Sequence, residues 1–94
     1  MEDKVEFYKK LKSQLDDLTK VWPSKYMYKF IVPADGGGVK EIEDKFEGLG
    51  SVIKTRNSKT GKYTSITINV IMPSSDSIIK KYRDCENVKG IISL

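Results

Sequence analysis

The chain has 94 residues, and its 17 lysines and arginines exceed its 13 aspartates and glutamates by a net charge of +4. That length predicts one domain with a modest core. The sequence holds no histidine and one cysteine, which excludes an internal disulfide and an ordinary zinc site. It also lacks an apolar run near 20 residues. We therefore expect no metal, no cofactor, no membrane span and a cytoplasmic location.

Residues 2–20 have the pattern of an amphipathic helix, because apolar residues recur at spacings of three and four with lysine or aspartate between them. The apolar stripe consists of Val5, Tyr8, Leu11, Leu15 and Leu18. The helix should end before Pro23, with Val21 and Trp22 folded back as an apolar plug. We assign residues 1–22 to an N-terminal helix and residues 23–94 to a compact domain. The stripe either packs on that domain or binds a protein partner.

Strict alternation of side chains predicts the first strand over residues 25–32. Three aromatic residues share one face of it, namely Tyr26, Tyr28 and Phe30. They form either part of the core or a base-stacking platform. Core packing is favoured because Lys29 makes the opposite face the better solvent side.

A glycine-rich loop follows this strand and leads into a helix predicted over residues 39–47. Glycines ahead of a helix start can turn backbone N–H groups toward an anion. The candidate ligand-binding residues are therefore Asp35, Gly36, Gly37, Gly38 and Val39. Glu41 and Glu43 would repel an anion nearby, so a flexible connection is the alternative interpretation.

Residues 51–56 and 66–72 predict two antiparallel strands joined by a turn. We predict a three-residue loop from Lys59 to Gly61, because glycine accepts the left-handed conformation that ends such a loop. This loop pairs Val52 with Ile68 and puts Lys54 on the apolar face. The hairpin is either purely structural or presents an anion-contacting tip. The tip residues are Arg56, Lys59 and Lys62.

A serine N-cap in residues 73–76, with Asp76 in the first turn, predicts another helix. Cys85 lies near the end of this helix and is interpreted as a small buried filler, since no partner base is available to activate it. Residues 87–94 then predict the last strand.

The predicted order is a helix followed by β-α-β-β-α-β, which is the ferredoxin-like α+β fold with a sheet in the order 4-1-3-2. Both helices of that unit cover one face of the sheet. The other face, called the open face, is predicted to carry Met27, Lys29, Ile31, Ile53, Thr55, Ser65, Thr67, Asn69 and Ile71. Lys29, Ser65, Thr67 and Asn69 are its candidate binding residues. The N-terminal helix or a second copy of the chain should cover this face.

Three stretches resemble the YbeD-like family of small bacterial proteins of unknown function: Trp22-Pro23, Tyr28-Lys29-Phe30, and the run from Ser58 to Asn69. The resemblance implies a ferredoxin-like fold akin to the ACT-type regulatory domain, and it supplies no catalytic residues. ACT-type domains bind small effectors, often amino acids, at paired domains. Their first strand–helix loop contributes to that site, and the matching loop here is Asp35 to Val39.

Our first hypothesis is therefore a non-catalytic regulatory or ligand-sensing module that forms a homodimer. The alternative is a protein–protein adaptor that uses the N-terminal helix or the open face. A third hypothesis, single-stranded RNA binding, is disfavoured because Tyr63 is the one aromatic residue predicted on the open face, so nucleic acid is not an expected partner. An enzyme is not expected, because Glu41 and Asp44 lie on a solvated helix face without a base–nucleophile pair.

Overall fold

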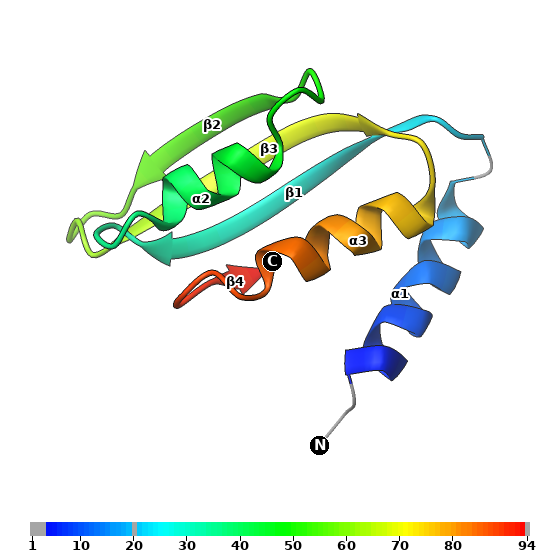
Figure 1. The fold of residues 1–94 in the computed structure, drawn as a ribbon, viewed down its shortest axis with the longest axis horizontal. Coiled ribbons are helices and arrows are strands. Elements are labelled where there is room, and N and C mark those ends of the chain that lie inside the picture. The colour runs from blue at the N-terminus through cyan, green and yellow to red at the C-terminus, as the bar shows by residue number, and fades with distance from the viewer. Residues whose placement is uncertain (1–3, 20, 94) are drawn as a thin grey trace.

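The computed structural model describes residues 4–19 and 21–93. Its elements are α1 (Lys4–Leu18), β1 (Ser24–Pro33), α2 (Gly38–Lys45), β2 (Val52–Asn57), β3 (Tyr63–Met72), α3 (Ser75–Cys85) and β4 (Ile92–Ser93). The four strands form one antiparallel sheet in the order β2-β3-β1-β4 (Figure 1). The predicted ferredoxin-like α+β fold, its sheet order and its additional N-terminal helix are confirmed.

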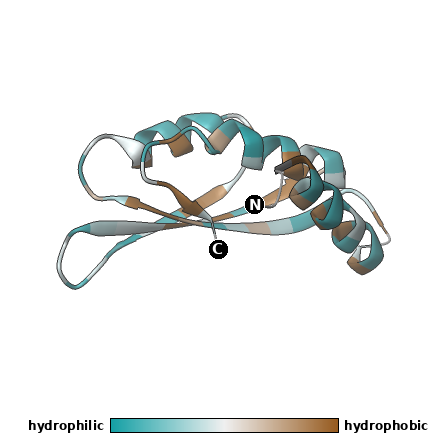
Figure 2. Cartoon of the chain, turned by 90° about the horizontal axis from the view of Figure 1, so that it is seen from below, coloured by the Kyte–Doolittle hydropathy of each residue, from teal (hydrophilic) through white to brown (hydrophobic). Residues whose placement is uncertain are grey.

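The core lies between the sheet and the helices α2 and α3, which cover the same face (Figure 2). The strand residues on this helix-side face include Tyr28, Phe30, Val32, Ile66 and Ile68, all fully buried. The Tyr28 ring lies 5.0 Å from the ring of Phe46, and its hydroxyl donates a 2.9 Å hydrogen bond to the carbonyl of Ile78. The aromatic residues of β1 are therefore core residues and not a stacking platform.

Helix α1 packs against α3 and leaves the open face bare (Figure 1). Leu15 is buried, and the Tyr8 hydroxyl donates a 2.9 Å hydrogen bond to Glu86 beyond the end of α3. Two members of the predicted stripe, Val5 and Leu18, are exposed. The expectation that this helix covers the open face is wrong, because α3 occupies its apolar side.

The prediction that Val21 and Trp22 fold back as an apolar plug before β1 is confirmed for Trp22 and wrong for Val21. Trp22 is partly buried and packs on the core, whereas the side chain of Val21 is 75% exposed. Within the predicted helix at 2–20, residues 4–18 are helical and residue 19 is not; positions 2, 3 and 20 lie outside the described residues.

The predicted hairpin register is wrong by one residue. Val52 pairs with Asn69, and the strands close at Ser58, whose amide donates a 2.8 Å hydrogen bond to the carbonyl of Tyr63. The loop therefore has four residues, 59–62. Because side chains alternate along a strand, this shift reverses both faces of β2. Lys54 lies on the open face, and Ile53 contacts the core instead.

The physical reason is the cost of burying a lysine. The observed register keeps the ammonium group in water and buries part of an isoleucine. The predicted placement of Lys54 on the apolar face, and of Ile53 and Thr55 on the open face, is therefore corrected. Gly61 does adopt the expected left-handed conformation, with φ of 73°.

β4 begins at Ile92, later than the predicted start at residue 87, because turns precede it; position 94 of the predicted strand lies outside the described residues. Gly90 has φ of 73°, and a Cβ at this position would lie 2.8 Å from Cγ of Pro33.

The predicted serine cap is confirmed, since Ser74 accepts a 3.1 Å hydrogen bond from the amide of Ser77. Cys85 is fully buried, as predicted.

Candidate functional site

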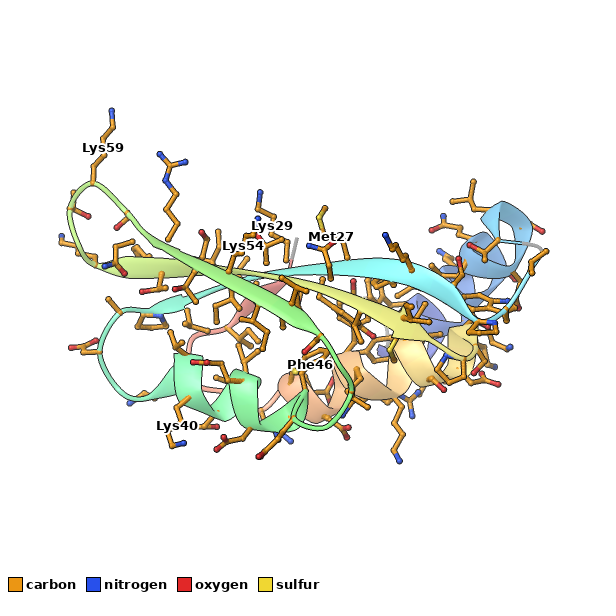
Figure 3. All side chains as sticks on the ribbon, turned by 90° about the horizontal axis from the view of Figure 1, so that it is seen from above. Met27, Lys29, Lys40, Phe46, Lys54 and Lys59 are labelled. Carbon is orange, nitrogen blue, oxygen red and sulfur yellow. The ribbon has the colours of Figure 1, made fainter. Side chains whose placement is uncertain are left out.

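Most of the sequence-predicted site residues lie on two separate surfaces. The first is a hollow of about 330 Å³ beside the loop between β1 and α2, called the loop hollow. It is lined by Pro33, Asp35, Gly36, Gly38, Glu41, Lys89 and Gly90. The second surface is the open face of the sheet, on the side away from α2 and α3 (Figure 3).

Glycines shape the first wall of the loop hollow. Gly36 and Gly37 have φ of 94° and 78°, which L side chains rarely adopt, so the chain can reverse between β1 and α2. Gly38 packs so closely that a Cβ there would lie 3.3 Å from Cβ of Val32. The start of α2 therefore rests directly on the end of β1.

The loop between α3 and β4 forms the opposite wall. Gly90 lies against Pro33 at a distance that leaves no room for a side chain, and it brings Lys89 to the edge of the hollow. The sequence offered no signal for this contribution, because Lys89 and Gly90 follow Asp35 by more than 50 positions. Only the tertiary packing of the α3–β4 loop on the end of β1 brings them together.

The predicted ligand-binding residues therefore separate into two groups. Asp35, Gly36 and Gly38 line the loop hollow, whereas Gly37 is the N-cap of α2 and Val39 packs on the core. Glu41, which the sequence analysis treated as a repulsive neighbour of an anion, lies in the lining itself. The lining therefore contains two acidic residues and one basic residue.

The open face is built from alternating rows of side chains. The registers place Lys54, Thr67 and Lys29 in one row across β2, β3 and β1. The neighbouring rows are Arg56–Ser65–Ile31–Ile92 and Val52–Asn69–Met27. The four candidate residues predicted for this face do lie on it, namely Lys29, Ser65, Thr67 and Asn69. Lys54 and Arg56 were missed because the predicted register was shifted.

The predicted anion-contacting tip is not one site. Arg56 and Lys59 line a hollow of about 320 Å³ on the open face, called the hairpin hollow, together with Ile31, Tyr63 and Ser65. Lys62 lines a different depression on the side of the β1–α2 loop. The four-residue loop turns Lys62 away from the other two cations.

Three further observations concern metal ligands, the single cysteine and apolar helices in the described part of the chain. No group of three or more histidine, cysteine, aspartate or glutamate side chains there could hold a metal ion. Burial raises the pKa of the Cys85 thiol to about 11, so the thiol stays protonated at neutral pH. Among residues 4–19 and 21–93, no helix is long and apolar enough to cross a membrane.

The sheet order and the two helices on one face define a ferredoxin-like α+β module, to which an N-terminal helix is added. The structure is similar to the ACT domain from GTP pyrophosphokinase of Chlorobium tepidum, with a TM-score of 0.53 and 9% sequence identity. The alignment covers 76% of this chain and 100% of that domain. At this identity the similarity shows the fold alone.

A sequence model of the family described as "Protein of unknown function (DUF493)" matches residues 19–93. The chain belongs to this family, which is the YbeD-like family that the sequence resembled. No curated protein matches the chain.

Proposed function

We propose that this protein is a non-catalytic regulatory module that binds a small zwitterionic effector, such as an amino acid, in the loop hollow. One observation carries the proposal: two acidic residues, Asp35 and Glu41, and one basic residue, Lys89, line the same hollow. An amino acid presents the complementary pair, an ammonium group and a carboxylate. The ACT-like fold supports the proposal, since the resemblance implies effector binding at this loop.

The effector site should work in a cytoplasmic homodimer, as the resemblance to paired ACT-type domains implies. Light scattering tests the mass, and thermal unfolding in the presence of each amino acid or nucleotide tests the ligand. A ligand at about 100 times its dissociation constant should stabilise the fold by about 2.7 kcal/mol. For a domain of this size, that corresponds to a rise in Tm of about 10 °C or more.

Matched variants connect such a shift to the loop hollow. Asp35→Asn and Lys89→Met each remove one of the charges that would pair with the effector. Asp17→Asn and Lys40→Met make the same chemical changes at exposed helix positions outside the hollow. We expect the first pair to lose most of the ligand-induced rise in Tm and the second pair to keep it. Equal shifts in all four variants, or no stabilising amino acid, would contradict the proposal.

A further inference from the structure

The fold separates charges that are mixed along the sequence. The strands contain four charged residues, all of them basic and all on the open face: Lys25, Lys29, Lys54 and Arg56. No strand contains aspartate or glutamate. Setting these four aside leaves 13 basic residues against 13 acidic ones, so the open face accounts for the whole net charge of +4.

These cations are spaced across the middle of the sheet. Lys29 and Lys54 flank Thr67 on neighbouring strands, so their Cα atoms lie about 10 Å apart. Arg56 follows Lys54 on the same face of β2, about 7 Å further along the strand. Among the residues that the structure describes, no carboxylate forms an ion pair with any of these side chains. Figure 3 shows Lys29, Lys54 and Lys59 rising from the same side of the sheet.

Apolar side chains fill the spaces between the cations. Large apolar residues of the open face remain about half exposed or more: Met27 56%, Val52 56%, Ile71 61% and Ile92 49%. The hairpin hollow adds a recess between Ile31 and Tyr63, with Arg56 and Lys59 beside it. An exposed apolar patch bordered by polar residues is typical of a surface that binds another molecule.

We propose that the open face docks an acidic amphipathic segment of a partner protein. The carboxylates of the segment pair with Lys29, Lys54 and Arg56, and one of its apolar side chains enters the hairpin hollow. This site is distinct from the loop hollow, so the inference goes beyond the effector-binding function proposed above.

Two other occupants fit the open face less well. A symmetric pair of copies joined through it would bring cations against cations, which costs several kcal/mol for close like charges. A nucleic acid would meet the positive charge but few stacking partners, because Tyr63 is the one aromatic residue among the described residues of the face. The exposed aliphatic side chains instead match apolar residues of a protein segment.

The test uses labelled probes of defined chemistry and fluorescence anisotropy. The main probe is a fluorescein-labelled 12-residue peptide in which glutamate alternates with leucine, and its matched control has glutamine in place of glutamate. A mixed-sequence single-stranded DNA of 12 nucleotides is the third probe. We expect the glutamate peptide to bind the full chain most tightly, and more weakly at 200 mM than at 50 mM salt.

A pair of double variants with equal net charge locates the binding. Lys29→Glu/Lys54→Glu reverses the central cations of the open face, whereas Lys40→Glu/Lys80→Glu reverses two exposed lysines on α2 and α3. Lys40 points to the opposite side of the molecule (Figure 3). We expect the first double variant to raise the Kd of the glutamate peptide at least tenfold, and the second to change it less than twofold. Thermal unfolding checks that both variants remain folded.

Several outcomes would overturn the proposal. Equal weakening by both double variants would mean general charge attraction, and equal binding of the glutamine peptide would exclude pairing with carboxylates. Tighter binding of the DNA that competes with the peptide would assign the face to nucleic acid. A rise in molecular mass with concentration that the Lys29→Glu/Lys54→Glu variant alone removes would assign it to a second copy. No binding of any probe would reject the docking site.

Discussion

The two faces of the central sheet are made from the same strands and have opposite chemistry. On the helix-side face, Tyr28, Phe30 and Ile68 are fully buried under α2 and α3. On the open face, the intervening residues Met27 and Lys29 reach solvent (Figure 3). Alternation along each strand therefore lets the helix-side face stabilise the fold while the open face remains available for binding.

Ionisable side chains also differ between the helix-side face and the open face. In the helix-side core, burial raises the pKa of the Tyr28 and Tyr82 hydroxyls and of the Cys85 thiol, which further disfavours their charged forms. The charged residues of the described strands lie on the open face and are all basic. The fold therefore allows a charged binding surface without placing an ion in the small core.

The largest difference between the faces should appear on β1 itself. Phe30→Ala removes a fully buried ring, and we expect a loss of about 3–5 kcal/mol in the free energy of unfolding. Met27→Ala removes a side chain that is 56% exposed on the other face, and it should cost less than about 1 kcal/mol. Urea denaturation followed by circular dichroism measures both. A comparable loss for Met27→Ala would show that the open face is covered in solution.

A smaller difference tests the register of the hairpin. Ile53 packs on the core and should lose about 1–2 kcal/mol on replacement by alanine, whereas Val52 on the open face should lose less than about 0.5 kcal/mol. The same urea experiment compares the two variants. The opposite order of losses would restore the three-residue loop, because that register exchanges the faces of β2.

Much of the fold could be predicted from the sequence. Alternation assigned the faces of β1 and β3 correctly, because the apolar and polar sets of each strand are distinct. β2 is short and carries apolar residues at neighbouring positions, Val52 and Ile53, so its pattern allows two registers. The predicted register of β2 and β3 followed from a three-residue loop that ends at Gly61. The cost of burying the ammonium group of Lys54 decides the observed register instead. The last strand was overestimated because its apolar residues fit both faces.

The candidate sites were less predictable. Asp35 and Gly36 could be identified because a glycine-rich loop follows the first strand. Lys89 joins them through tertiary packing alone, and no local pattern marks it. The positive charge of the open face was also hidden. Acidic and basic residues are interleaved along the chain, and the separation appears only when the strands of the sheet are aligned in their observed registers.

The smallest expected difference between the faces concerns protonation at high pH. The folded protein raises the pKa of the buried Cys85 thiol from 9.0 to about 11. Below about pH 9 the thiol is protonated in both states, and its contribution to stability is fully present. Between about pH 9 and 11 the unfolded state loses the proton first, so the free energy of unfolding falls as the pH rises.

Cys85→Ala should therefore lose less stability than the wild-type protein between pH 8 and 10.5, by on the order of 1 kcal/mol. Urea denaturation at each pH gives the free energy of unfolding, and the change between the two pH values is compared for the variant and the wild type. Packing lost in the variant lowers its stability equally at both pH values, so it does not contribute to this change. Lys54→Met, at an exposed position of the open face, is the matched control. The reasoning fails if the stability of Cys85→Ala falls as steeply as that of the wild type, because burial of the thiol would then not govern its protonation.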